Sequence, residues 1–178
     1  MQGILVFGDS IAFGRGNNSQ RGWSGRLREY FESLDEYNAV YTLAIPGETS
    51  TGLLKRIEIE AQARTKVLRE EDTYTIIITI GINDAKLLGS KNIPQTRPET
   101  FRKNIQEIIR IAKKYAEQIV VLGLTPVDEK LTNPYEGTWF SNQRIQEYNE
   151  VLKEISVQEQ TSFLDLFAQL KKKSFLHC

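Results

Sequence analysis

The chain has 178 residues, a length that suits one domain with a full hydrophobic core, and we predict a single domain over residues 1–178. Hydrophobic residues make up 40% of the chain and charged residues 26%, as is usual for a globular protein. Because Lys+Arg and Asp+Glu both number 23, the formal net charge is zero, and this balance argues against a nucleic acid or an anionic membrane as a partner.

Strand-like apolar runs alternate with segments of helical periodicity along the chain. The expected strands are residues 3–8, 39–45, 73–81, 118–125 and 161–165. Four helical faces are expected between them: Trp23, Leu27, Tyr30, Phe31 and Leu34; Leu53, Leu54, Ile57 and Ala61; Phe101, Ile105, Ile108, Ile109 and Ala112; and Ile145, Tyr148, Leu152 and Ile155. The second helix is expected to begin near Ser50, and Pro98 should stand in the first turn of the third.

This alternation predicts an α/β fold in which helices cover both faces of a five-stranded parallel sheet. In such sheets, ligands bind beyond the carboxyl ends of the strands. The residues that directly follow the strands are therefore the first candidates for a functional site.

Glycine and small polar residues follow four of the expected strands. The segments are Gly8-Asp9-Ser10, Ile45-Pro46-Gly47-Glu48-Thr49, Gly81-Ile82-Asn83-Asp84 and Thr125-Pro126-Val127-Asp128-Glu129. Any one of them alone is typical of an ordinary turn with an Asx or N-cap hydrogen bond. Together, at one edge of a sheet, they supply a hydroxyl group, backbone N–H groups that glycine leaves accessible, and an asparagine amide.

This set of groups suits acyl transfer, in which a nucleophile attacks a carbonyl carbon and hydrogen-bond donors receive the oxyanion. We predict that Ser10 is the nucleophile. Its own backbone N–H, the N–H of Gly47 and the side-chain amide of Asn83 would form the oxyanion hole. Asp9 and Asp84 are expected to brace their loops by accepting backbone hydrogen bonds rather than to act on a substrate.

Several stretches also resemble a known family. "VFGDSIAFG", "AIPGETSTGLL" and "TIGINDAK" are similar, in order and spacing, to the first three sequence blocks of the SGNH (GDSL) hydrolase superfamily, whose Ser, Gly and Asn would fall on Ser10, Gly47 and Asn83. "GLTPVDE", "IQEYNEVLK" and "SFLDLF" resemble the bacterial branch, so the likeness runs from residue 4 to about residue 167. The resemblance implies a flavodoxin-like three-layer α/β/α sandwich. It also implies hydrolysis of carboxylic esters or thioesters, of the esterase or lipase kind, without a metal or other cofactor.

The catalytic base is where the chain departs from the pattern of this family. The fourth block of the family is Asp-x-x-His, but the one histidine of this chain is His177, and Ser174 stands three positions before it. Asp165, the nearest acid upstream, is expected to end the last strand and cap the next helix. Three readings are open: His177 is the base, the sequence stops before the true Asp-x-x-His block and a following helix, or the protein has no base and is not a hydrolase.

Other function classes find less support in the sequence. One cysteine, Cys178, excludes an internal disulfide and argues against a zinc site. The chain has no P-loop, no Gly-x-Ser-x-Gly motif and no clean dinucleotide-binding pattern. The alternative to an enzyme is a non-catalytic module on the same scaffold that binds a small ligand or a carbohydrate. Tyr135, Trp139 and Phe140, in the loop after the fourth strand, either line an acyl or sugar site or anchor that loop by packing.

No stretch approaches the ~20 apolar residues that span a bilayer, and no signal peptide precedes the first strand. We therefore predict a cytoplasmic protein that acts on a small-molecule ester, although a chain that begins after a removed signal peptide would look the same. The sequence predicts neither the acyl group, nor the leaving group, nor the oligomeric state.

Overall fold

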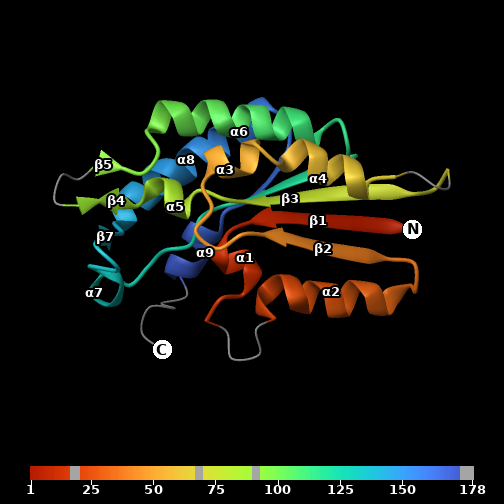
Figure 1. Cartoon of the computed structure of the whole chain (residues 1–178), viewed down its shortest axis with the longest axis horizontal. Helices are drawn as coiled ribbons and strands as arrows, with labels where there is room; N and C mark the ends of the chain where they lie inside the picture. Colours follow the sequence, from red (N-terminus) through yellow and green to blue (C-terminus); the bar gives the residue numbers. More distant parts are fainter. Residues whose placement is uncertain (17–20, 67–69, 90–92, 173–178) are drawn as a thin grey trace.

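The computed structural model describes residues 1–16, 21–66, 70–89 and 93–172. Its centre is a five-stranded sheet made of β1 (Gln2–Gly8), β2 (Ala39–Ala44), β3 (Thr73–Thr79), β6 (Gln118–Leu122) and β8 (Ser162–Leu164). The strand order is β2-β1-β3-β6-β8, and each neighbouring pair is parallel (Figure 1). The order reverses between β1 and β3, so the carboxyl ends of these two strands form the switch point where ligands of such sheets bind.

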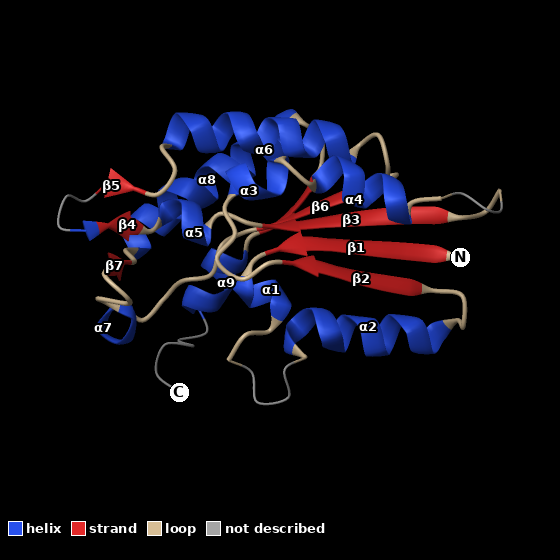
Figure 2. Ribbon diagram, in the orientation of Figure 1, coloured by secondary structure: helices blue, strands red, loops and turns tan. Residues whose placement is uncertain are grey.

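Helices cover both faces of this sheet, which confirms the predicted three-layer α/β/α sandwich (Figure 2). One face carries α3 (Ser50–Leu54), α4 (Ile57–Arg64), α6 (Pro98–Ala112) and α8 (Asn142–Gln158). The other carries α2 (Gly22–Leu34), with α1 (Ser10–Phe13) and α9 (Leu166–Lys172) on the same side. Among the residues described, no helix is both long and apolar enough to cross a membrane.

The larger part of the core lies between the sheet and the face of α6. Leu5, Ile76 and Ile78 of the central strands are fully buried there, together with Phe101 and Ile105 of α6. A smaller apolar cluster on the opposite face joins Val6 and Val40 to Trp23, Leu27 and Phe31 of α2. Both faces of β1 are thus buried, as expected for the apolar run that the sequence shows there.

The predicted face of α2 is wrong for two residues, because Tyr30 and Leu34 are 66% and 59% exposed. The start of this helix packs against α1 and the residue that follows it through small residues instead. Ser24 is buried and its hydroxyl donates to the carbonyl of Ala12. A Cβ built on Gly22 would lie 2.5 Å from the Cα of Gly14, so these backbones touch. The close contact turns the buried side of α2 toward Ser24 and leaves Tyr30 in solvent.

The helix expected from Ser50 begins at that residue, but it breaks near Lys55 into α3 and α4. The Lys55 and Arg56 N–H groups bond to carbonyls three residues back, which tightens the last turn of α3 and ends it. The strands also end sooner than predicted at their carboxyl ends, since β3 stops at Thr79 and β6 at Leu122. The residues that follow these earlier strand ends belong to the loops at the carboxyl edge of the sheet.

Two segments outside the predicted strands and helices contain regular structure. Residues 82–97 form α5 (Ile82–Ala85), β4 (Leu87–Leu88) and β5 (Ile93–Pro94). The loop after β6 contains α7 (Glu129–Thr132) and β7 (Thr138–Trp139). The three short strands pair as an antiparallel sheet, β5-β4-β7, which lies beyond the carboxyl end of the main sheet (Figure 1). This small sheet fastens the loop after β6 to the segment that follows β3.

Candidate active site

Ser10 stands at the end of β1, at the first position of α1. Asp9 caps this helix, because its Oδ1 accepts a hydrogen bond of 2.9 Å from the N–H of Ile11. Gly8 is required for close packing: a Cβ there would lie 2.6 Å from Cγ2 of Thr79 on the neighbouring strand. The tight junction between strand and helix therefore presents Ser10 at the switch point of the sheet.

Gly47 lies in the turn after β2, where the N–H of Glu48 bonds to the carbonyl of Ile45 at 3.1 Å. Its φ of +80° is in the left-handed region, which residues with a Cβ rarely adopt. Nothing lies within 4 Å of the place a Cβ would take, so this backbone faces open space. Glycine is needed here for the backbone conformation, and it also leaves its N–H open to approach.

Asn83 is on α5, the short helix that follows β3, and is 7% exposed. Its Nδ2 donates a hydrogen bond of 3.0 Å to the carbonyl of Glu48, next to Gly47. The same nitrogen lies 3.5 Å from Oδ2 of Asp9, at the long limit of a hydrogen bond. Asn83 therefore links the loops that follow β1 and β2.

The structure brings Ser10, Gly47 and Asn83 to the wall of one cavity of about 580 Å³. The other wall residues are Ile11, Arg15, Gly16, Lys86, Thr132, Tyr135, Glu136, Thr138 and Phe140. Tyr135 and Phe140, two of the three aromatic residues singled out from the sequence, thus line this cavity. The third, Trp139, pairs with Leu87 in the small sheet and is not part of this wall.

The turn that carries Gly47 is held by a buried ion pair between Glu48 and Arg56. The guanidinium donates to both carboxylate oxygens of Glu48, through Nε at 2.8 Å and through Nη2. Nη2 also donates to the carbonyl of Leu43 at 2.8 Å, at the end of β2. The side chains of Arg56 and Glu48 are only 15% and 6% exposed. Arg56 also bonds to Glu60 at 3.3 Å, whereas the charge of Glu48 depends on Arg56.

Replacing Arg56 by methionine is expected to lower the free energy of unfolding by about 3–5 kcal/mol, because it leaves the carboxylate of Glu48 buried without a partner. Urea denaturation of Arg56→Met measures this loss. The double variant Glu48→Gln/Arg56→Met should lose less, since it leaves no buried charge. An equal loss in both variants would mean that the packing of Arg56 matters and its pairing does not.

Asp84 braces the loops in the way that the sequence predicted. It is fully buried, and its carboxylate accepts hydrogen bonds from the N–H of Ser50 at 2.9 Å and from the hydroxyl of Ser50 at 2.6 Å. Nδ2 of Asn104, on α6, donates to the same hydroxyl at 3.0 Å. Burial raises the pKa of Asp84, and the hydrogen bonds from Ser50 oppose the rise. The network joins the start of α3 to the helix that carries Asn83.

Burial raises the pKa of Asp9 from 3.8 to about 6, because the hydrogen bond from Ile11 offsets only part of the desolvation. The nearby carboxylates of Asp84 and Glu48 contribute to this rise. Between these two pKa values the folded protein holds a proton that the unfolded chain releases. The contribution of Asp9 to stability is therefore most favourable below pH 4 and falls as the pH rises to about 6.

We expect Asp9→Asn to remove this dependence, so that the stability of the variant relative to the wild type rises by up to about 3 kcal/mol between pH 4 and pH 7. Asparagine keeps an oxygen for the N–H of Ile11. Urea denaturation across this pH range provides the measurement. Asp35→Asn is the matched control, because Asp35 is exposed and makes the same kind of bond, to the N–H of Tyr37. Parallel pH profiles for wild type and Asp9→Asn would contradict the prediction.

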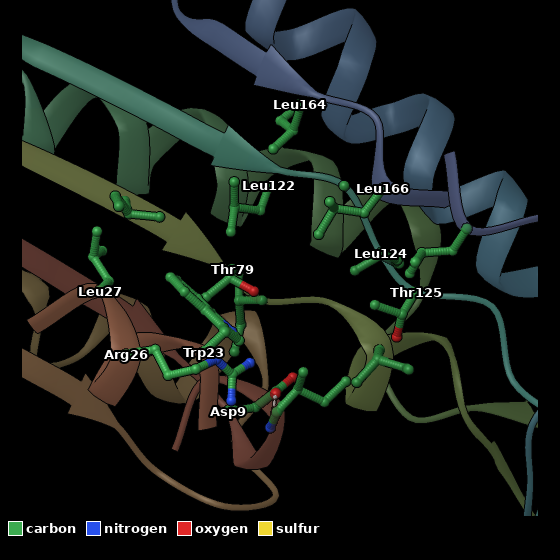
Figure 3. Close-up of a pocket in the computed structure, with 16 residues that line it drawn as sticks. Asp9, Trp23, Arg26, Leu27, Thr79, Leu122, Leu124, Thr125, Leu164 and Leu166 are labelled. Atoms are coloured by element: carbon green, nitrogen blue, oxygen red, sulfur yellow. Dashed lines mark hydrogen bonds between the residues drawn. The ribbon is translucent and has the colours of Figure 1, made fainter. Parts of the chain in front are cut away.

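Figure 3 shows a second cavity, mainly apolar, whose volume is about 580 Å³. Its walls include Leu27 on α2, Leu122 on β6, Leu164 on β8 and Leu166 on α9, with Asp9 at one side (Figure 3). Ile11 lines both cavities, so they are neighbours at α1. The apolar walls contribute to the dry surroundings of the Asp9 carboxylate.

The remaining predicted site residue, His177, lies outside the described residues, as does Cys178. Asp165 caps α9 through a bond of 3.0 Å from the N–H of Ala168 to its Oδ1, as predicted. One cationic wall residue, Lys86, was not singled out from the sequence. The one signal that could have found Lys86 is its spacing, three residues after Asn83 and directly after α5.

Residues 6–176 match the GDSL-like lipase/acylhydrolase family, and the chain belongs to this family. It is therefore a carboxylic ester hydrolase of the GDSL type with the fold of the SGNH hydrolases.

Particular relatives are known from sequence and from structure. The chain is 24% identical to esterase TesA of Pseudomonas aeruginosa over 168 residues, which are 94% of this chain and 72% of that protein. A member of the lipolytic G-D-S-L family from Veillonella parvula superposes with a TM-score of 0.70 at 19% identity, over 100% of this chain and 85% of the other. The lipase/acylhydrolase from Enterococcus faecalis gives a TM-score of 0.70 at 23% identity, over 97% and 80%. These structural likenesses show the common fold.

Proposed function

We propose that the chain hydrolyses carboxylic esters or thioesters through an acyl-enzyme formed on Ser10. The observation that carries this proposal is that Ser10, Gly47 and Asn83, which follow three different strands, line one cavity. A cavity of about 580 Å³ is of the size that commonly holds a small organic ligand.

In the proposed reaction, the Ser10 oxygen attacks the carbonyl carbon of the ester while a base takes its proton. The oxyanion that forms accepts hydrogen bonds from the backbone N–H groups of Ser10 and Gly47 and from the amide of Asn83. The base then protonates the departing alcohol or thiol, and water cleaves the acyl-Ser10 ester by the same route in reverse.

Asn83 suits this role because only one of its two amide hydrogens is firmly held. One bonds to the carbonyl of Glu48 at 3.0 Å and fixes the orientation of the side chain. The contact with Asp9, at 3.5 Å, is long, so the second amide hydrogen is available to donate to a developing oxyanion. A donor that is already oriented costs little reorganisation when the charge appears.

We assign the base to His177, the sole histidine of the sequence. The test is His177→Gln, which should reduce ester hydrolysis by about 10²–10⁴-fold if this imidazole takes the proton of Ser10. Unchanged hydrolysis would reject the assignment. A protein extended by the downstream reading frame then tests the second reading, because a gain in activity would place the base in the extension.

The nucleophile itself is tested with a fluorophosphonate probe, whose phosphorus is attacked by an activated serine with loss of fluoride. We expect covalent labelling of the wild type, mapped to Ser10 by peptide mass spectrometry, and no label on Ser10→Ala. Absence of label on an active wild-type protein would overturn the assignment of Ser10. A wild-type protein that neither reacts nor hydrolyses any ester would favour the ligand-binding module.

A further inference from the structure

Lys86 is a half-buried cation in the wall of the cavity that contains Ser10. It follows α5 directly and stands three residues after Asn83, which places it about one helical turn from the proposed oxyanion donor. Within the described part of the chain, its side chain forms no ion pair or hydrogen bond. The residues outside that part include no Asp or Glu side chain that could serve as its partner.

The acidic residues near this cavity are already engaged. Glu48 is paired with Arg56, and Asp84 is bonded to Ser50. Asp9 is buried, accepts a hydrogen bond from the N–H of Ile11, and lines the neighbouring cavity rather than this one. These three carboxylates therefore do not neutralise Lys86.

Among the described residues that line the cavity, positive charge is in excess. Arg15, from the segment after α1, adds a second cation, and Glu136 adds one carboxylate. Partly buried charges without a partner are costly, and a charged residue is one of the few polar groups by which a binding cavity orients and selects its ligand. In this described part of the wall, two cations stand against one carboxylate, which leaves room for a ligand with a single negative charge.

We propose that this cavity selects esters that carry a carboxylate besides the ester bond, and that Lys86 binds this carboxylate. The inference rests on the proposed function for the ester and adds the chemical class of the substrate. The ammonium group offers three donors and a compact charge, and Arg15 adds long-range attraction from the rim. Because Lys86 is one turn from Asn83, the carboxylate lies several bonds from the scissile carbonyl.

The test uses two esters that differ only at the far end of the acyl chain. They are 4-nitrophenyl hexanoate, which is neutral, and the mono-4-nitrophenyl ester of adipic acid, in which a carboxylate replaces the terminal methyl group. At low salt we expect kcat/KM of the wild type to be about tenfold higher for the anionic ester, because a charge-assisted hydrogen bond commonly contributes a free energy of this size. Added NaCl should reduce this preference, because it screens the charge of Lys86.

Lys86→Met keeps the length of the side chain and removes the charge, so it should abolish the preference and change hydrolysis of the neutral ester by less than about threefold. Lys86→Arg should retain part of the preference. The matched control is Lys55→Met, which removes an exposed lysine outside the cavity and should leave the ratio of the two esters as in the wild type. Equal kcat/KM values for both esters in the wild type would overturn the proposal.

A binding measurement separates this proposal from the hydrolase mechanism. Ser10→Ala cannot form the acyl-enzyme, so calorimetry can compare its affinity for the two intact esters. We expect tighter binding of the adipate ester, and loss of this difference in Ser10→Ala/Lys86→Met. If the wild type hydrolyses neither ester but the binding preference is present, the mechanism fails and the anion site stands. If the wild type hydrolyses both without preference and Ser10→Ala shows no binding difference, the anion site fails and the mechanism stands.

Discussion

Ser10→Ala is expected to lower kcat/KM for 4-nitrophenyl hexanoate by about 10⁴-fold or more, because it removes the atom that forms the acyl-enzyme. The oxyanion donors and the cavity remain, so a residual rate above that of water is expected. Steady-state kinetics with the rigorously purified variant measure this loss of kcat/KM. Ser10 is at the first position of a short helix, where alanine is tolerated, so the free energy of unfolding should change by less than about 0.5–1 kcal/mol.

Ser33→Ala is the matched control for this loss. Ser33 is exposed on α2 and its hydroxyl bonds only locally, to the carbonyl of Tyr30 at 2.7 Å. Its replacement should leave kcat/KM within about twofold of the wild type, as for most surface substitutions. If Ser10→Ala retains a tenth or more of the wild-type rate, another group is the nucleophile and the acyl-enzyme is not formed at the end of β1.

The sheet and the position of the candidate site follow from local patterns in the sequence. Apolar runs such as residues 73–81 are long enough to be recognised as buried strands, and parallel strands bring their carboxyl ends to one edge. For that reason Ser10, Gly47 and Asn83 could be grouped without knowledge of any contact between them. The bond that Asp9 accepts from Ile11 follows from local turn chemistry. Asp84 accepts its bonds from Ser50 in another loop, so its partner could not be predicted.

The parts that could not be predicted depend on contacts between distant or very short segments. The orientation of α2 is set by the contact of Gly22 with Gly14, and a hydrophobic pattern does not register contacts between small residues. The strands of the small sheet have only two residues each, too few for any periodicity. Nothing in the sequence distinguishes Lys86 from an ordinary surface lysine. It becomes a wall residue only because β7 brings the loop after β6 to β4.

Asn83→Ala is expected to lower kcat by about 10²–10³-fold with little change in KM, because a donor to the oxyanion acts in the transition state and hardly at all in the bound ester. The same change removes the hydrogen bond to the carbonyl of Glu48, and this loss should cost about 1–3 kcal/mol of stability. A fall in kcat alone would therefore not distinguish donation to the oxyanion from a displaced turn at Gly47.

Asn104→Ala separates the two effects. Asn104 is buried to a similar degree as Asn83, and its amide also makes two hydrogen bonds, to the hydroxyls of Ser50 and Thr51, but it does not line the cavity. We expect a comparable loss of stability in urea denaturation with a fall in kcat of less than about tenfold, because Asn104 supports the loops without facing the ester. If the two variants lose kcat equally, the amide of Asn83 acts only by holding Glu48 and Gly47 in place. The oxyanion would then be left to the two backbone N–H groups.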